Sequence, residues 1–202
     1  MGVCYIVGAG DFSCRFTPTA DDLVIAADGG YDNLTSIGIT PDLLIGDLDS
    51  IRETPNGIET LRHPIKKDET DMLLSYIEGA RRGYTEFLIY GGTGGREDHT
   101  FANYSLLLYI TERGHKATLF SDTGEVYMIK NSDITLSGES EKHLSIFPFG
   151  CVAHGVSIKG AEYECESITL TPEFPLAVSN RFVGRQVSIS VTDGALIIMK
   201  EL

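Results

Sequence analysis

The sequence contains no tryptophan and few basic residues, and these shortages exclude several classes of protein. Lys and Arg together number 16 against 29 Asp and Glu, so the net charge is −13 at pH 7. A surface that binds duplex nucleic acid or an anionic membrane needs a basic patch, and none is visible, so neither partner is expected. No stretch approaches the ~18 consecutive apolar residues of a membrane-spanning helix.

Cysteine is also scarce, and its positions favour packing over metal binding or disulfide formation. Cys4, Cys14, Cys151 and Cys165 show no close metal-type spacing. The opening segment MGVCYIVGAGD lacks the basic region and cleavage site of a secretory signal, so we expect a cytoplasmic protein with reduced thiols. The acidic balance means that an anionic substrate would need local help from a metal, Lys, Arg or backbone N–H groups.

The common nucleotide and hydrolase motifs are missing. No Lys lies between a Gly and a Ser or Thr as in a P-loop, and Gly8-Ala9-Gly10 lacks the third glycine of a dinucleotide fingerprint because Ser13 occupies that position. Neither HExxH nor the GxSxG nucleophile elbow occurs. Any nucleotide chemistry must therefore use another arrangement.

The first half of the chain is typical of an α/β domain. The apolar runs CYIVGAG, LVIAADGG, DLLIGD, EFLIYGG and KATLFSD predict strands. Helical spacing of apolar residues follows at Met72, Leu73, Ile77 and Ala80, and a second helix containing Phe101 and Leu106 ends near Gly114. Alternating strands and helices predict a mostly parallel sheet flanked by helices over residues 1–123.

The second half reads as all-β. The runs GEVYMIK, HLSIFPF, GVSIKG, ESITLT, RQVSISV and ALIIMK are short and are separated by Gly, Ser, Asn and Asp. No helical period of useful length occurs among them. Residues 124–202 therefore predict a sandwich-like β domain joined to the first by a short linker.

Charged residues and glycines gather where the predicted strands of the first half end. Such residues are usually turns or helix caps when taken singly, but ligands of open α/β sheets bind beyond the carboxyl ends of the strands. Asp47 and Asp49 are two apart in an extended segment, so their side chains point to one side and repel unless a cation or proton lies between them. The other candidates at this edge are Asp28, Gly29, Lys66, Lys67, Asp68, Asp71, Gly94, Gly95, Arg96, Asp98 and His99.

This set of residues predicts phosphoryl transfer. Mg²⁺ is typically held by one or two protein carboxylates together with substrate phosphates, and Asp47, Asp49 and Asp71 would supply the carboxylates. The glycine-rich segment GGTGGR precedes a helix and could offer backbone N–H groups to a phosphate. Arg96 could bind phosphate through two parallel hydrogen bonds.

The blocks ADGGYDNL (27–34), GITPDLLIGDLDSI (38–51), KKDETDMLL (66–74), GGTGGREDHTFANYSLLL (91–108) and SNRF (179–182) together resemble the thiamine pyrophosphokinase (thiamine diphosphokinase) family. The resemblance covers nearly the whole chain. It implies an α/β catalytic domain, a β-sandwich domain that helps to bind thiamine, and a homodimer with active sites at its interface. It also implies Mg²⁺-dependent transfer of a pyrophosphoryl group from ATP to the thiamine hydroxyl, with AMP as the second product.

The resemblance assigns roles position by position. Asp47, Asp49 and Asp71 match the catalytic, metal-binding carboxylates, and Ser179 and Asn180 match the residues that face thiamine. The positions that match the nucleotide and phosphate site are Asp28, Gly29, Lys67, Asp68, Thr70, Gly94, Gly95, Arg96, Asp98 and His99. Leu48 replaces the usual Phe and Arg181 stands where Glu is common. The absence of tryptophan excludes the tryptophan stacking on thiamine of eukaryotic relatives.

Two other functions use the same residues. A binding protein for thiamine or a nucleotide could keep the fold without turnover, although the full acidic set argues against it. A Mg²⁺-dependent nucleotide hydrolase could use the same acidic edge, although the SNRF block favours a dedicated acceptor site. Thiamine-dependent formation of AMP from ATP distinguishes the three.

Overall fold

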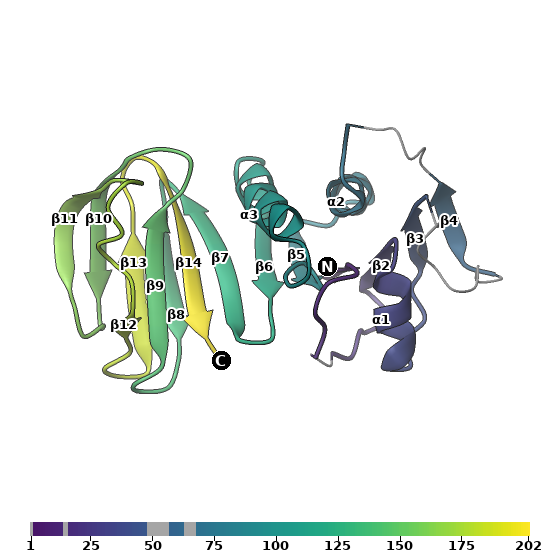
Figure 1. Cartoon of the computed structure of the whole chain (residues 1–202), viewed down its shortest axis with the longest axis horizontal. Coiled ribbons are helices and arrows are strands. Elements are labelled where there is room, and N and C mark those ends of the chain that lie inside the picture. Colours follow the sequence, from purple (N-terminus) through teal and green to yellow (C-terminus); the bar gives the residue numbers. More distant parts are fainter. Residues whose placement is uncertain (1, 14–15, 48–56, 63–67) are drawn as a thin grey trace. The chain divides into compact units, whose positions relative to one another are not determined.

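The short apolar runs of the first half, and one largely polar segment, form parallel strands. These are β1 (Cys4–Val7), β2 (Leu23–Ala27), β3 (Leu43–Gly46), β4 (Glu59–Arg62), β5 (Glu86–Tyr90) and β6 (Lys116–Phe120) (Figure 1). In space they follow the order β6-β5-β1-β2-β3-β4, and each neighbouring pair is parallel. All residues of β1, β2 and β3 are buried, which explains why these strands read as continuous apolar runs without alternation. This computed structural model describes residues 2–13, 16–47, 57–62 and 68–202.

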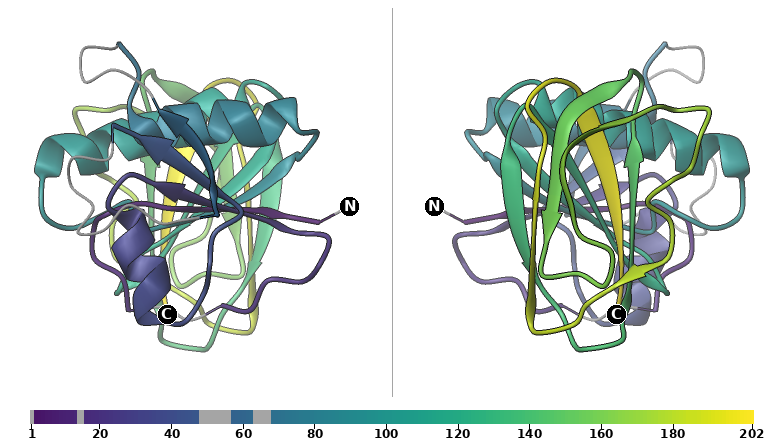
Figure 2. Two further views of the ribbon diagram at one scale, coloured as in Figure 1. Left: turned by 90° about the vertical axis from the view of Figure 1, so that its right-hand side faces the viewer. Right: turned by 90° about the vertical axis from the view of Figure 1, so that its left-hand side faces the viewer.

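Helices cover both faces of the parallel sheet. α1 (Gly30–Ser36) and α2 (Asp71–Arg81) lie on opposite faces (Figures 1 and 2), and α3 (Glu97–Thr111) follows β5. Leu34 of α1 shares a buried cluster with Tyr5 and Val7 of β1. On the other face, Gly79 of α2 packs so closely on the sheet that a Cβ there would lie 2.8 Å from the Cys4 sulfur. Glycine at this position lets α2 approach β1.

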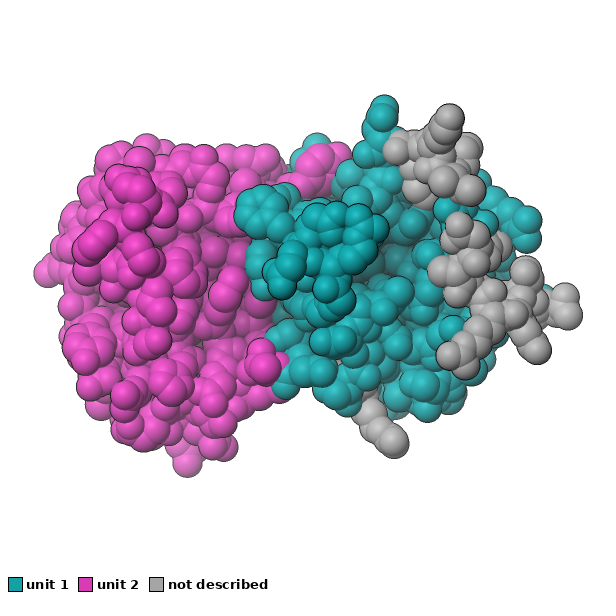
Figure 3. Space-filling model, in the orientation of Figure 1, with its two compact units in different colours: residues 1–106, 113–122 teal, residues 107–112, 123–202 magenta. Residues whose placement is uncertain are grey.

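Contacts divide the chain into two compact units (Figure 3). Unit 1 contains residues 1–106 and 113–122, and unit 2 contains residues 107–112 and 123–202. The strands of unit 2 are β7 (Gly124–Lys130), β8 (Asp133–Ser137), β9 (His143–Pro148), β10 (Ala153–Lys159), β11 (Cys165–Leu170), β12 (Asn180–Arg181), β13 (Gln186–Ser190) and β14 (Ala195–Glu201).

Unit 2 is built from antiparallel strands in two groups. One has the order β12-β9-β14-β7 and the other the order β11-β10-β13-β8. One buried cluster contains residues of both groups, including Ile146 of β9, Ile158 of β10 and Ile198 of β14. The prediction of an α/β region and a separate antiparallel β region is confirmed.

Several elements depart from the sequence-based prediction. α1, β4, β8 and β12 are absent from it, because they are short and are mostly polar or begin in glycine. The helical spacing assigned to α2 is correct, but Ile77 is 40% exposed while Tyr76 and Gly79 are buried. The face of α2 that packs on the sheet therefore contains Tyr76 and Gly79, and Ile77 lies outside it.

The helices and cysteines of the described residues bear on membrane insertion and thiol chemistry. Each of their helices is too short or too polar to cross a bilayer. Cys4, Cys151 and Cys165 are free thiols, and burial raises the pKa of the Cys4 thiol far above its ordinary value. Cys14 lies outside the described residues. A buried, fully protonated thiol such as Cys4 is a packing group and not a nucleophile.

Candidate active site

The strand order of unit 1 reverses beside β1. β2 pairs with one edge of β1 and β5 with the other, so the chain crosses from one side of β1 to the other between β4 and β5. Because all four strands β5, β1, β2 and β3 are parallel, their carboxyl ends lie along one edge of the sheet. Open α/β sheets bind ligands at this kind of reversal. The segments after β1 and β5 are therefore the expected walls of a site.

A cavity of about 650 Å³ lies at this edge, entirely within unit 1. Gly8 and Gly10 line it after β1, and Gly91 and Gly92 line it after β5. The predicted site residues that line it are Asp28, Asp47, Thr70, Asp71, Gly94, Gly95, Arg96 and His99. Residues that follow β1, β2, β3, β4 and β5 in the sequence thus meet around one space.

Unit 2 contains a larger cavity, of about 1150 Å³, with a different character. Its lining includes Lys142 and Lys200, which are paired with Glu201 at 3.5 Å and Glu125 at 2.7 Å. None of the predicted acidic or glycine residues lines it. Predicted site residues line the smaller cavity, in unit 1, which is therefore the candidate active site.

Four described carboxylates line the unit 1 cavity, namely Glu69 and three aspartates. Asp28 and Asp47 follow β2 and β3, and Asp71 begins α2. Asp28 adopts a left-handed backbone (φ +47°), and its N–H donates to the Ile45 carbonyl at 2.7 Å. Asp49 lies outside the described residues, and among those described no group of three or more His, Cys, Asp or Glu side chains is set to hold a metal. The Asp47–Asp49 metal pair remains a prediction.

The start of α2 fixes the position of Asp71. Thr70 is the N-cap, and its hydroxyl oxygen accepts a hydrogen bond from the Leu73 N–H at 3.2 Å. Such a cap contributes about 1 kcal/mol to stability. Asp71 lies in the first turn, where the positive end of the helix dipole stabilises its negative charge. Glu69 also lines the cavity, whereas Asp68 is exposed and does not line it.

Two glycine segments pack backbone to backbone along one side of the cavity. The Gly10 N–H donates to the Gly91 carbonyl at 2.8 Å, and the Asp11 N–H donates to the Thr93 carbonyl at 2.8 Å. A Cβ at Gly10 would lie 2.2 Å from the Thr93 oxygen, and a Cβ at Gly91 would lie 2.2 Å from the Gly8 oxygen. Side chains cannot be accommodated there, so glycine is required by close backbone approach.

Arg96 lies at the end of the glycine-rich segment, just before α3. Arg96 lines the cavity and its guanidinium binds the Asp98 carboxylate, to which the His99 N–H donates at 3.0 Å. The hydrogen bond from Arg96 lowers the pKa of Asp98 below its usual value. Asp98 itself does not line the cavity. The exposed guanidinium is planar and presents N–H donors of the kind that bind an oxyanion, two of which here bind Asp98.

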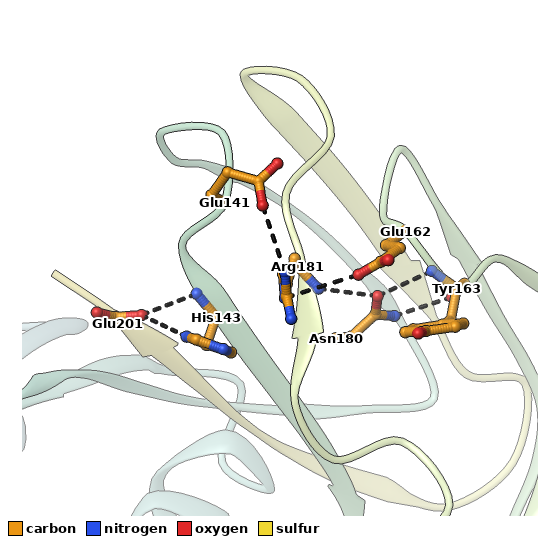
Figure 4. Close-up of polar contacts among 7 residues, drawn as sticks. All are labelled: Glu141, His143, Glu162, Tyr163, Asn180, Arg181 and Glu201. Carbon is orange, nitrogen blue, oxygen red and sulfur yellow. Dashed lines mark hydrogen bonds and ion pairs between the residues drawn. The ribbon is translucent and has the colours of Figure 1, made fainter.

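Ser179 and Asn180 lie in unit 2, where their environments differ. Ser179 is exposed, has a left-handed backbone (φ +57°), and its N–H donates to the Ser145 hydroxyl at 3.1 Å. Asn180 is 3% exposed, and its side-chain amide bonds both the N–H and the carbonyl of Tyr163 at 2.9 Å (Figure 4). Arg181 lies between Glu141 and Glu162, at 3.3 and 3.7 Å.

Family models match both halves of the chain. The model described as "Thiamin pyrophosphokinase, catalytic domain" matches residues 18–119, and that described as "Thiamin pyrophosphokinase, vitamin B1 binding domain" matches residues 130–196. The chain belongs to the thiamin pyrophosphokinase family. The reaction of this family transfers a pyrophosphoryl group from ATP to thiamine.

Individual members of the thiamin pyrophosphokinase family resemble the chain over most of its length. The thiamine pyrophosphokinase of Bacillus subtilis (strain 168) is 27% identical over 185 residues, which cover 88% of this chain and 86% of the relative. A crystal structure of the Bacillus subtilis protein has a TM-score of 0.90, with 24% identity and 98% of each chain covered. The Candida albicans thiamin pyrophosphokinase has a TM-score of 0.73, with 15% identity, 100% of this chain covered and 89% of the other. The fold of unit 1 and unit 2 is that of the family.

Sequence reasoning missed part of the site that the thiamin pyrophosphokinase fold assembles. Gly8 and Gly10 line the cavity, although their segment fails the dinucleotide pattern, and Met72 and Asn103 line it from α2 and α3. The signal for the two glycines was their position directly after an apolar strand. Gly29 is the N-cap of α1 and does not line the cavity, and Lys67 lies outside the described residues.

Proposed function

We propose that the chain transfers the pyrophosphoryl group of ATP to the hydroxyl group of thiamine, giving thiamine diphosphate and AMP, at the cavity of unit 1. The observation that carries the proposal is the meeting of two glycine segments, three aspartates and Arg96 at the strand reversal beside β1. Family membership supplies the reaction. In this reaction the thiamine oxygen bonds to the β-phosphorus of ATP, the bond from that phosphorus to the oxygen of the α-phosphate breaks, AMP leaves with that oxygen, and the hydroxyl proton passes to solvent.

The polyphosphate of ATP would bind between the glycine segments and the start of α3. Backbone N–H groups at a helix start attract phosphate oxygens, and Arg96 offers a second, charged donor set. Phosphoryl transfer requires mainly positioning and charge stabilisation, because the protein forms no covalent bond to the phosphate. Asp71 would accept a hydrogen bond from the thiamine hydroxyl and orient its oxygen for attack.

The donor set of the cavity fits Mg²⁺. Mg²⁺ prefers carboxylate and water oxygens and is usually held by one or two carboxylates plus substrate phosphates, so a preformed cage of protein ligands is unnecessary. Asp47 and Asp71 line the cavity and would hold the ion together with Asp49. When bound, Mg²⁺ would neutralise charge on the phosphates during transfer.

The acceptor would be held in part by Ser179 and Asn180, within the half that matches the vitamin B1 binding model. We further propose a cytoplasmic homodimer in which each active site takes residues from both chains. A symmetric dimer allows the β unit of each chain to serve the partner's catalytic unit twice by the same contact. Asn180 is buried and bonds the Tyr163 backbone, so it would serve the acceptor site by holding the Tyr163 segment in place.

A coupled assay for AMP tests the proposed function. Purified protein is incubated with ATP and Mg²⁺, with and without thiamine, and AMP and thiamine diphosphate are quantified. Equal amounts of AMP and thiamine diphosphate, formed only when thiamine is present, support the transferase. Nucleotide cleavage without thiamine would indicate a hydrolase, and binding of both substrates without product would indicate a regulator.

A further inference from the structure

Asn33 connects α1 to the segment that follows β1. Its side-chain nitrogen donates to the Gly8 carbonyl at 2.8 Å and to the Gly10 carbonyl at 3.1 Å. Gly8 and Gly10 line the cavity, whereas Asn33 does not. One side chain outside the cavity therefore uses its two N–H donors to hold two carbonyl groups of the cavity wall.

The second glycine segment is held in the same way. The side-chain nitrogen of Asn103, which is 6% exposed, donates to the Gly92 carbonyl at 2.7 Å. The Gly91 and Thr93 carbonyls accept from the backbone N–H groups of Gly10 and Asp11. Five carbonyl oxygens of the two segments thus accept from protein donors, those of Gly8, Gly10, Gly91, Gly92 and Thr93.

The N–H groups of the second segment are used differently. In the described part of the chain, the hydrogen bonds leave the backbone N–H groups of Gly92, Gly94 and Gly95 without a protein acceptor. A carbonyl oxygen turned toward a polyphosphate would repel it, while an N–H group attracts it. The bound carbonyls cannot turn toward the ligand, and these N–H groups stay available to it. The wall can therefore present partial positive charge to an anionic ligand.

We propose that Asn33 is a positioning residue for the polyphosphate of the nucleotide. It holds the Gly8–Gly10 segment against the Gly91–Gly95 segment, so that the carbonyls stay fixed and the N–H groups face the phosphates. This inference rests on the proposed function and extends it to a residue that does not touch the substrate. Asn33 supports the part of the wall that faces the polyphosphate. Its loss should therefore weaken the binding of ATP, which has three phosphates, more than the binding of AMP, which has one.

Two variants and one control test this role. Asn33→Ala removes both hydrogen bonds, and Asn33→Ser shortens the side chain but keeps one donor. Thr35→Ala is the control, because Thr35 lies on the same helix and its hydroxyl donates to the Tyr31 carbonyl at 2.9 Å. Calorimetry with Mg²⁺ measures the affinity for AMP and for the α,β-methylene analogue of ATP, which resists transfer. Thermal unfolding confirms which variants are folded, and the serine variant serves if the alanine variant is not.

Loss of the two hydrogen bonds should weaken binding of the ATP analogue by about tenfold, with a change of less than about threefold for AMP. The KM for ATP should rise similarly, while the KM for thiamine and the binding by Thr35→Ala stay unchanged. Equal losses for AMP and the ATP analogue, or no loss in a folded Asn33 variant, would overturn the positioning role alone. Failure of the unsubstituted protein to bind the ATP analogue would overturn the proposed function as well.

Discussion

Arg96 and Asp98 are joined by two hydrogen bonds, from Nε to Oδ1 at 3.1 Å and from Nη2 to Oδ2 at 2.6 Å. The two side chains are 69% and 65% exposed, so the pair contributes little to the stability of the fold. A guanidinium that binds a carboxylate through two parallel bonds can bind a phosphate in the same way. Asp98 therefore occupies Nε and Nη2 of Arg96, two of the donors that the proposed site would offer to the polyphosphate.

Replacing Arg96 by Lys should raise the KM for ATP by about tenfold, because a single ammonium cannot make two parallel hydrogen bonds to phosphate. Steady-state kinetics over a range of ATP concentrations measure the effect. Arg185→Lys, an exposed substitution in unit 2, is the matched control. An unchanged ATP dependence would show that Arg96 is a solvent-exposed residue with no part in binding.

The carboxylates of the cavity should be required for turnover and dispensable for folding. Asp47→Asn, Asp49→Asn and Asp71→Asn should each lower kcat about 100-fold or more, because each removes a charge beside Mg²⁺ and the phosphates. Unfolding midpoints should change little, since neutralising one of several clustered carboxylates relieves repulsion. The measurement is kcat as a function of Mg²⁺ concentration for each variant. Near-normal activity of these variants at saturating Mg²⁺ would contradict the metal assignment.

Acid should destabilise the fold through Glu78. The Arg81 side chain, with both contacts at 2.7 Å, and then Arg82, lower the pKa of the Glu78 carboxyl from its ordinary 4.5 to about 2. A lowered pKa means that the unfolded chain binds more protons between these values, so the stabilisation is present above pH 4.5 and is lost as the pH falls toward 2. Chemical denaturation at several pH values measures the free energy of unfolding. This free energy should depend less steeply on pH in Glu78→Gln than in the unsubstituted protein. The exposed Glu86→Gln is the control, and an unaltered slope for Glu78→Gln would refute the prediction.

Subunit mixing tests the shared active site. Asp49→Asn and Asn180→Ala proteins, each nearly inactive alone, should recover activity when their subunits exchange, because a mixed dimer contains one site with both defects and one with neither. Recovery should approach half of the wild-type activity per mixed dimer. Folding of Asn180→Ala must be verified first, since Asn180 is buried. No recovery despite confirmed exchange would place the complete site on one chain.

The fold was largely predictable because its strands carry strong local signals. The runs after Met1 and around Leu23, Leu43 and Phe87 are apolar and end in glycine, so they predicted buried parallel strands that the structure contains. β4 was missed because its residues, Glu59–Arg62, are polar or half-exposed at the sheet edge. The two-residue β12 exists through its pairing with β9, which no local pattern encodes.

The site was predictable where chemistry is visible in one segment and was missed where it depends on contacts between segments. Asp47, Asp71 and Arg96, which line the unit 1 cavity, could be named as candidates because charged residues after strands are distinctive. Asn33 and Asn103 could not, because an asparagine within a helix reads as an ordinary polar residue. Their importance comes from carbonyl groups of Gly8, Gly10 and Gly92, which approach them only in the folded chain.

The central position of β1 has a consequence for synthesis. Its second partner, β5, ends at Tyr90, roughly 60 residues after the end of β2. At a translation rate of about 5–20 residues per second, one edge of β1 stays unpaired for roughly 3–12 seconds. That edge belongs to the strand Cys4–Val7, every residue of which is buried in the finished sheet, and open apolar edges pair with other chains. Substitutions that delay the docking of β5 should therefore lower the yield of soluble protein before they alter the catalytic rate.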